Sequence, residues 1–400
     1  MKHASIIPLI GGETIASEKV FGTSPDVLYS YSPFEANDSH LLNYYKSQNK
    51  DIPYIVLDKD QYDSNLAGKA DVISAVCPCA GLSTLSKTSG ADNPLNDWME
   101  TSARFVLGTL KPRVFWGENA PQFASKSGTK IREKIYKIGR ENGYTMTVYK
   151  TRSLIHGLPQ IRSRSFYFFW KETNQVPILQ YYKRPMTSLE DLLDSVKSNF
   201  QTEVTNTKIP TEDKYYKFIL ERIHPGMTHA EFAASLEKSS DVMQYIHKSG
   251  YNFSDMYQYF TEIGDEKEAA KCARNQAKID AGGGIMYRYT IIPRLYTGAF
   301  VGHLPTQLTH HKQDRYLNYR ECMSIMGLPE DFELLNPKKS LNHICQNVPV
   351  RTAMDMATEV KAYLEGNRFM AKANMMFQSN DKKTEFIQEK DEETLEEHFA

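Results

Sequence analysis

The chain has 400 residues, of which 40% are hydrophobic and 24% are charged, and its formal net charge is −1. This composition is ordinary for a soluble globular protein, and the length predicts one large domain with a smaller one. No apolar run approaches the roughly 18 residues of a membrane span, and Gly11 and Gly12 interrupt the N-terminal apolar run. We therefore expect no membrane segment, no signal peptide and a cytoplasmic location.

Cysteine usage argues against a disulfide scaffold and against a metal centre. The chain has five cysteines, and only Cys77 and Cys79 lie close together. A zinc site needs a second close pair of Cys or His ligands, and His310 with His311 is the nearest approach to one. The sequence predicts no metal site.

Charge is distributed unevenly along the chain. Residues 271–320 contain eight Lys or Arg against two Asp, whereas residues 371–400 contain eight acidic residues against four Lys. The first stretch is a candidate surface for a polyanion, although a solvated surface is the more common role for such a stretch.

The first 170 residues alternate short apolar runs with amphipathic segments. Such alternation predicts an α/β domain with a doubly wound, mostly parallel sheet, in which ligands bind at the carboxyl ends of the strands. Gly11-Gly12 and Pro78-Cys79 both follow predicted strands. The predicted strands cover residues 5–9, 26–32, 54–57, 72–76, 114–116 and 165–170, and the predicted helices cover residues 41–48, 98–110 and 131–142.

The alternation stops after residue 170. Thr228 and Glu231 form a capping box, and residues 187–200 have a helical pattern. We therefore expect a smaller, largely helical domain over residues 171–304. Residues 305–368 should return to the first domain, with helices at 316–326 and 350–364. The acidic segment 369–400 is predicted to be a disordered tail.

Residues 77–83 (CPCAGLS) form a turn directly after the strand predicted at 72–76. A cysteine on such a turn, close to backbone N–H groups, is suited to covalent catalysis, and Cys79 is followed by Gly81 and Ser83. A buried structural cysteine is the equally common alternative. Cys77 is a rival nucleophile, but strand alternation places it within the apolar run.

Two further polar segments lie at strand ends. Glu118 and Asn119 follow the strand at 114–116, where a carboxyl group can act as a general acid or can simply cap a helix. Gln160, Arg162 and Arg164 alternate ahead of the strand at 165–170, so their side chains should share one face. Three such residues on one face are unlikely to be unrelated surface residues at a strand edge. Arginine is suited to binding a carbonyl oxygen or a phosphate.

Together these segments resemble the DNA (cytosine-5)-methyltransferase family over residues 5–170 and 305–365. The family's order is a Pro-Cys loop, a Glu-Asn acid, a Gln-x-Arg-x-Arg strand, a variable target-recognition region, a late Arg-containing segment and an Asn-Val-Pro turn. The late pieces correspond to residues 315–321 (RYLNYRE), 326–332 (MGLPEDF) and 346–350 (QNVPV). The resemblance implies a Rossmann-like fold that uses S-adenosyl-L-methionine as methyl donor.

The resemblance also implies a role for each matching residue. Cys79 would be the nucleophile, Glu118 would contact cytosine nitrogen 3, and Arg164 would contact the cytosine carbonyl with Arg162 in support. The substrate pocket would further include Ser83, Asn119 and Gln160. The methyl donor would contact Pro8, Leu9, Ile10, Gly11, Gly12, Pro78, Asn347 and Val348, with Glu35 (preferred to Asn37) on the ribose and Asp58 or Asp60 on the adenine.

The implied substrate is a cytosine flipped out of duplex DNA, read by residues 171–304. We expect a monomer, and a cognate restriction endonuclease is an expected partner. An RNA cytosine methyltransferase and a catalytically inactive DNA-binding relative are the alternatives. A nicotinamide-dependent dehydrogenase is disfavoured because no Gly-x-Gly-x-x-Gly follows the first strand.

Overall fold

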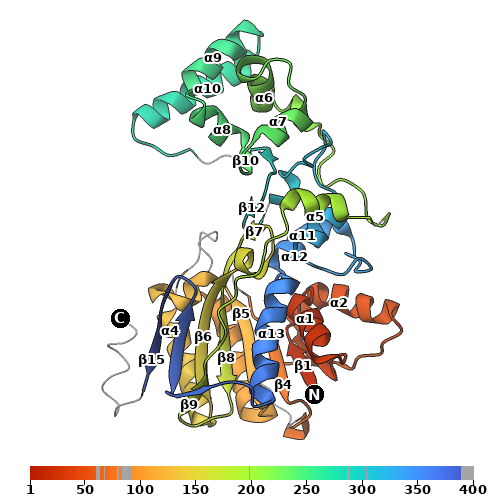
Figure 1. Ribbon diagram of the computed structural model, residues 1–400, viewed down its shortest axis with the longest axis vertical. Helices are drawn as coiled ribbons and strands as arrows, with labels where there is room; N and C mark the ends of the chain where they lie inside the picture. Colours follow the sequence, from red (N-terminus) through yellow and green to blue (C-terminus); the bar gives the residue numbers. More distant parts are fainter. Residues whose placement is uncertain are drawn as a thin grey trace. The chain divides into compact units, whose positions relative to one another are not determined.

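The computed structural model describes residues 1–59, 64–66, 68–78, 81–82, 90, 92–197, 199–285, 289–302 and 304–388. It divides into two compact units (Figure 1). The first comprises Met1–Met186 and Met326–Ala400, and the second comprises Thr187–Ile325.

The first unit is built on one large sheet. Among the described residues, nine strands pair in the order β15-β14-β6-β8-β5-β4-β1-β2-β3, and only β8 and β15 run antiparallel to their neighbours. The strands are β1 (His3–Ile6), β2 (Val27–Tyr31), β3 (Tyr54–Leu57), β4 (Val72–Val76), β5 (Val114–Asn119), β6 (Thr145–Arg152), β8 (Ser163–Trp170), β14 (Met375–Ser379) and β15 (Lys382–Ile387). The predicted doubly wound α/β fold is confirmed.

Helices connect the parallel strands by crossovers. The chain leaves β1 toward β2 but leaves β4 toward β5, so right-handed crossovers place the connecting helices on opposite faces. Helix α13 packs against α1, as Figure 1 shows. The helices of this unit are α1 (Gly12–Phe21), α2 (Glu35–Ser47), α3 (Asp97–Ala103) with a π-helical continuation (Arg104–Leu110), α4 (Thr129–Glu141), α12 (Pro337–Gln346) and α13 (Val350–Leu364).

The reversal of strand order between β1 and β4 creates a crevice at their carboxyl ends. The glycine loop, which contains Gly11 and Gly12, follows β1, and Cys77-Pro78 follows β4. Both predicted loops therefore lie at the point where this fold binds ligands.

Some predicted strands differ in extent. The run at 5–9 was predicted as a strand, but β1 ends at Ile6, because Ile7 and Leu9 have φ of 52° and leave the extended conformation. Strand β6 was not predicted. Its pattern mixes Thr and Lys with apolar residues, yet Thr147 is buried and accepts a hydrogen bond from Trp170 Nε1 at 2.9 Å.

The prediction of a disordered tail was wrong for residues 370–387. Strand β14 pairs in parallel with β6, and β15 returns antiparallel to β14. Met375, Met376 and Ile387 are buried in this hairpin. The prediction counted acidic residues over the whole segment 371–400, and most of them lie beyond the hairpin, so the apolar positions of the hairpin were overlooked. Residues 389–400 lie outside the described part of the chain.

The second unit is mainly helical and has its own core. The predicted capping box is confirmed: Thr228 N donates to Glu231 Oε2 at 2.8 Å, and Thr228 Oγ1 accepts from Glu231 N. Buried aromatic and aliphatic side chains, including Tyr216, Phe232 and Phe260, form the core. The helices are α5 (Leu189–Ser195), α6 (Lys214–Phe218), α7 (His229–Ser235), α8 (Val242–Lys248), α9 (Phe253–Glu262), α10 (Glu266–Asp280) and α11 (Tyr319–Ile325).

The first unit continues to Met186, beyond the residue 170 at which the strand–helix alternation stops. Strand β9 (Gln175–Pro177) pairs with β13 (Met370–Lys372). Arg184 then forms a bidentate ion pair with Asp355 on α13, with Nη2–Oδ1 and Nε–Oδ2 distances of 2.6 and 2.9 Å. These contacts bind the segment that follows β8 to the first unit.

A histidine pair joins α2 to α12 and makes the first unit sensitive to acid. His40 Nδ1 accepts a hydrogen bond from Leu335 N at 3.0 Å, so its Nε2 donates to His343 Nδ1 at 2.9 Å. Burial lowers the pKa of His40 to about 4 and also lowers that of His343.

We predict that this pair loses its stabilising effect as the pH falls. Because the folded pKa of His40 lies below its ordinary value, the unfolded chain takes up the proton first. Stability is full above about pH 6.5 and declines toward pH 4, by at most about 3 kcal/mol. Urea unfolding should show that wild type and His40→Gln differ most at pH 7 and least near pH 4.5. The exposed His247→Gln control should show no such trend, and a pH-independent difference for His40→Gln would contradict the account.

Candidate active site

The loop between β1 and α1 has an unusual backbone. Ile7 and Leu9 have φ of 52°, and Gly11, the N-cap of α1, has φ of 91°. Residues other than glycine are strained in this left-handed region, so neighbouring contacts must hold the loop. One such contact is a hydrogen bond from Leu9 N to Asp38 Oδ1 at 2.7 Å.

Asp38 was not predicted from the sequence. It is fully buried on α2 and also accepts hydrogen bonds from Ser30 Oγ on β2 and Tyr54 Oη on β3. Burial raises its pKa to about 6. Asp38 thus ties the loop between β1 and α1 to strands β2 and β3, and its position one turn after Glu35 on the inner face of α2 was the only signal for it.

Gly12 lies directly against the Asn-Val-Pro turn. Its N–H donates to Asn347 Oδ1 at 2.8 Å, and a Cβ atom added at Gly12 would lie 2.0 Å from Val348 O. Only glycine permits this approach. The structure therefore brings together two groups of residues that are distant in sequence and that were both predicted to bind the methyl donor.

Arg162 holds the same turn from the other side. Its side chain is buried, and Nη2 donates to Asn347 O at 3.1 Å. Gln160 is also buried, with Nε2 3.4 Å from Met326 Sδ. These two side chains support the segment that carries Asn347, whereas Arg164 has a different partner.

Arg164 pairs with Glu118 across β5 and β8. Arg164 Nε forms an ion pair with Glu118 Oε1, and Asn119 lies opposite Ser165 in the antiparallel register. Glu118 is 2% exposed and Arg164 is 9% exposed. Because water is largely excluded, the charges interact strongly and hold each other in a fixed geometry.

The end of β4 lies beside this pair, since Val76 is the register partner of Glu118. Cys77 follows as a buried residue, with Sγ 3.7 Å from both Trp98 O and Ser102 Oγ. Burial raises the pKa of the Cys77 thiol to about 11, so it stays protonated near neutral pH. Pro78 comes next, and Cys79 and Ser83 lie outside the described residues.

Acidic and aromatic residues gather after β2 and β3. Glu35 begins α2, and Asp58 follows β3 directly; both side chains are exposed. Asp60 lies outside the described residues. The Trp98 ring packs against Tyr31 and Phe34, with centroid separations of 4.9 and 5.0 Å. The arrangement offers carboxylates for hydroxyl groups and a flat apolar surface for a base.

Glu13 is a second residue that the sequence did not single out. It is 1% exposed, and its Oε2 atom has no hydrogen-bond partner among the described residues. Thr14 Oγ1 donates to Glu13 Oε1 at 3.0 Å and also contacts Ser5 Oγ at 2.7 Å. Burial, with smaller contributions from Glu118 and Asp38, raises the pKa of Glu13 to about 8, so at neutral pH the carboxyl group is mainly protonated.

These features fit S-adenosyl-L-methionine. Gly12 allows close backbone approach, and Asn347 Nδ2 is buried without a hydrogen-bond partner among the described residues. Glu35 and Asp58 suit the ribose and adenine ends, and the Glu13 carboxyl group suits a nearby cation.

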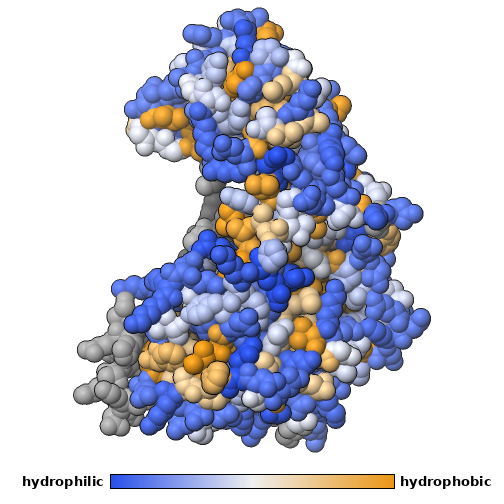
Figure 2. All heavy atoms as spheres, viewed as in Figure 1, coloured by the Kyte–Doolittle hydropathy of each residue, from blue (hydrophilic) through white to orange (hydrophobic). Residues whose placement is uncertain are grey.

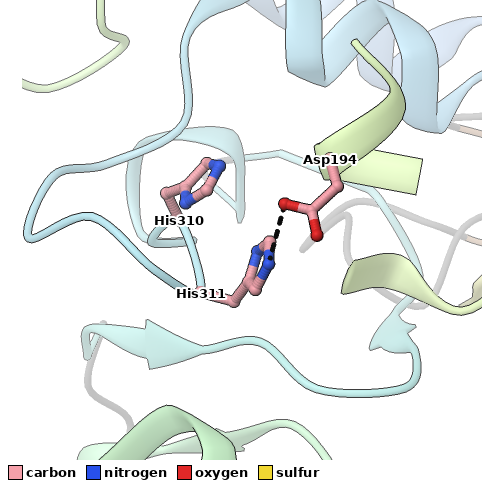
Figure 3. Close-up of side chains that lie close together, drawn as sticks. All are labelled: Asp194, His310 and His311. Atoms are coloured by element: carbon pink, nitrogen blue, oxygen red, sulfur yellow. Dashed lines mark ion pairs between the residues drawn. The ribbon is translucent and has the colours of Figure 1, made fainter. Parts of the chain in front are cut away.

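One described cluster in the second unit has metal-ligating side chains, namely Asp194, His310 and His311 (Figure 3). His311 Nε2 lies 3.2 Å from Asp194 Oδ1. His310 Nδ1, however, accepts the backbone N–H groups of Lys312 and Gln313 at 3.1 and 3.3 Å. Its neutral ring then carries its hydrogen on Nε2 and has no lone pair left for a metal, so we assign His310 to the loop rather than to an ion.

A comparison with known protein families shows which family this chain belongs to. The family model for C-5 cytosine-specific DNA methylase matches residues 2–362. The chain belongs to this family. The resemblance seen in the motifs is thus confirmed.

Individual relatives of this methylase are distant. The Type II methyltransferase M1.HphI of Haemophilus parahaemolyticus is 23% identical over 273 residues, which are 68% of this chain and 62% of that protein. The chain therefore matches about three fifths of that relative's length.

Solved structures share the fold. A DNA modification methyltransferase encoded within an Escherichia coli prophage has a TM-score of 0.55 at 14% identity, covering 91% of this chain and 99% of its own. The Entamoeba histolytica methyltransferase EhMeth has a TM-score of 0.54 at 11% identity, covering 91% and 98%. A DNMT2 mutant of Spodoptera frugiperda has a TM-score of 0.51 at 11% identity, covering 90% and 100%. Within the described part of the methylase, no helix has the length and apolar character needed to cross a membrane.

We predict that Gly12→Ala destabilises the methylase and weakens donor binding. The new methyl group would overlap Val348 O, so the loop and the turn must separate, at a cost of about 1–3 kcal/mol or more. Urea unfolding and calorimetric titration with S-adenosyl-L-methionine measure both effects. Gly108→Ala is the matched control, because the nearest atom to its new methyl group lies at 3.9 Å. Equal behaviour of the two variants would contradict the packing argument.

Proposed function

We propose that this chain transfers a methyl group from S-adenosyl-L-methionine to carbon 5 of a cytosine in duplex DNA, with Cys79 as the covalent nucleophile. The observation that carries the proposal is the buried Glu118–Arg164 pair, one strand away from the end of β4. Cys79 follows that strand by three residues in the sequence.

The chemistry requires these groups because carbon 5 of cytosine is a weak nucleophile. The Cys79 thiolate adds to carbon 6 while the Glu118 carboxyl group, in its protonated form, donates a hydrogen bond or a proton to nitrogen 3, which turns carbon 5 into an enamine-like nucleophile. Carbon 5 would then take the methyl group, whose bond to the donor sulfur breaks so that a neutral thioether leaves. A base removes the carbon 5 proton, and the carbon–sulfur bond breaks to return the thiolate and the aromatic ring.

Arg164 has two functions in this proposal. Its guanidinium would hydrogen-bond the cytosine carbonyl oxygen, and its ion pair with Glu118 fixes the orientation of the acid. Arg162 acts at a distance from the base, through Asn347 and the donor loop. We therefore assign Arg162 as a positioning residue.

The methyl donor supplies an electrophilic methyl group on a sulfonium when bound. Gly11, Gly12 and the Asn347-Val348 turn would hold its methionine end, and Glu35 with Asp58 or Asp60 its nucleoside. The Glu13 carboxyl group, protonated when no cation is near, would ionise beside the sulfonium.

The choice of Cys79 over Cys77 follows from burial. Cys77 is 1% exposed and its raised thiol pKa leaves little thiolate at neutral pH. A nucleophile must also reach a flipped base, and Cys77 is enclosed by Trp98 and Ser102.

Duplex DNA is favoured over RNA because the matching family model is described as a DNA methylase, and the curated relative is named as a Type II methyltransferase. By analogy with that name, we propose that this chain protects sites cut by a cognate restriction endonuclease. The Thr187–Ile325 unit would read the target sequence while the flipped cytosine enters the first unit.

We predict that Cys79→Ser abolishes methyl transfer and retains DNA binding, because serine cannot form the thiolate adduct. Cys77→Ser should keep most of the wild-type rate. Tritium transfer from labelled donor to DNA measures activity, and gel shift measures binding. An active Cys79→Ser enzyme, or an inactive but folded Cys77→Ser enzyme, would reverse the assignment.

We also predict that Glu118→Gln lowers the single-turnover rate by about 10²–10⁴-fold, because the amide cannot protonate nitrogen 3. Glu141, which ends α4, gives the matched control Glu141→Gln with an unchanged rate. If Glu118→Gln keeps the wild-type rate, Glu118 has only a structural role.

A further inference from the structure

A basic cleft lies on the first unit, outside the site described above. It has a volume of about 380 Å³ and lies between the loop after β5, strand β6 and the β14–β15 hairpin. Figure 2 shows a hydrophilic surface at the end of this hairpin. Its lining includes five basic residues and two acidic ones; the basic residues are Lys126, Arg132, Lys150, Lys382 and Lys383.

Four of the lysines in this cleft are available to a ligand. Lys126, Lys382 and Lys383 are exposed and Lys150 is half-buried, and none forms an ion pair with a described residue. One of the two acids, Asp381, is already paired with Arg152. Glu385 is the other acidic residue, so the basic residues give the cleft an excess of positive charge.

The floor of the cleft is rigid. Arg132 is buried, and its Nη1 donates to Ser125 O at 2.7 Å while its Nη2 donates to Thr129 Oγ1 at 3.0 Å. Its guanidinium also lies 5.4 Å from the centre of the Phe377 ring on β14. Arg132 therefore fixes the loop that carries Lys126 against the hairpin that carries Lys382 and Lys383.

The strand register places the cleft on the same edge of the sheet as the catalytic acid. Asn119 pairs with Ser165, Ser165 with Lys150, Lys150 with Ser379, and Ser379 with Lys382. With strands about 4.8 Å apart, Lys150 lies about 10 Å and Lys382 about 19 Å from the end of β5.

We propose that this cleft binds backbone phosphates of the DNA that flanks the target cytosine. The proposal rests on the proposed function, because it takes the substrate to be a duplex. A rise of about 3.4 Å per base pair places the contacts about three to six base pairs from the flipped base, on one side only. Lysine ammonium groups suit phosphate oxygens, and the contacts would carry no sequence information.

Five of the eight basic residues in the stretch 271–320 are paired or buried within the second unit. Within the basic stretch 271–320, Lys271, Arg294, Lys312 and Arg315 are engaged in ion pairs, with Glu268, Glu190, Asp194 and Glu321 respectively. Arg320 in the same stretch is fully buried. The cleft on the first unit supplies cationic side chains that are not used internally.

The test is the salt dependence of DNA binding by the full chain. We compare wild type with K382A/K383A and with the control K19A/K46A, which removes the same charge from exposed residues near the C-terminal ends of α1 and α2. The slope of log K against log salt is negative, and each lost phosphate contact reduces its magnitude by about 0.9. We expect K382A/K383A to reduce the magnitude of the slope by about 1–2 and the control to leave it unchanged.

Duplex length provides a second readout. On duplexes with about ten base pairs on both sides of the target, K382A/K383A should bind more weakly than wild type. Shortening the flank that contacts the cleft to about two base pairs should remove this difference, and shortening the other flank should leave it. An unchanged slope, or equal losses for K382A/K383A and K19A/K46A, would overturn the proposal. If K382A/K383A lost affinity for duplex RNA but not for duplex DNA, that result would also overturn the proposal.

The two proposals fail differently. A chain that binds DNA through the cleft lysines but transfers no methyl group contradicts the proposed function alone. A chain that methylates cytosine in DNA with equal salt slopes for wild type and K382A/K383A contradicts the cleft alone.

Discussion

The close approach of Gly12 to Asn347 and Val348 is the constraint on which the rest of the site depends. It joins the first crossover of the sheet to a turn more than 330 residues later, since Gly12 N donates to Asn347 Oδ1. Arg162 holds that turn through the Asn347 carbonyl, and Asp38 holds the glycine loop through Leu9 N. Because the backbones touch, a side chain at residue 12 would separate the two halves of the donor site.

The second organising element is a set of buried charges around the end of β5. Glu118 and Arg164 neutralise each other, whereas Glu13 forms no ion pair with a described residue and is protonated near neutral pH. A site of this kind is electrostatically prepared for a cationic donor and for a base that must be protonated. The exposed lysines of the basic cleft lie on the same sheet edge but work differently, since they are hydrated and sensitive to salt. The inner site therefore suits chemistry, and the cleft suits the holding of a long polyanion.

Much of the fold could be predicted from the sequence, and so could one side of the candidate site. Alternating apolar runs predicted the parallel strands, polar residues at strand ends indicated Glu118 and Arg164, and the family resemblance indicated Asn347. Asp38 and Glu13 escaped prediction because their importance comes from burial by distant segments, which no local pattern reports. Strand β14 escaped because it pairs with β6, more than 200 residues earlier, and an acidic segment follows it. The separate role of Arg162 also depends on a partner, Asn347, that alternation within one strand cannot reveal.

The central claim is that Cys79 adds covalently to cytosine carbon 6. The most direct measurement uses a duplex in which the target cytosine is replaced by 5-fluorocytosine. Fluorine cannot leave as the carbon 5 proton does, so after methyl transfer the carbon–sulfur bond cannot break. The account predicts a DNA–protein adduct, stable in denaturant and dependent on S-adenosyl-L-methionine, whose crosslinked peptide contains Cys79 as the modified residue by mass spectrometry. An enzyme that methylates ordinary cytosine yet forms no adduct, or an adduct on Cys77, would contradict it.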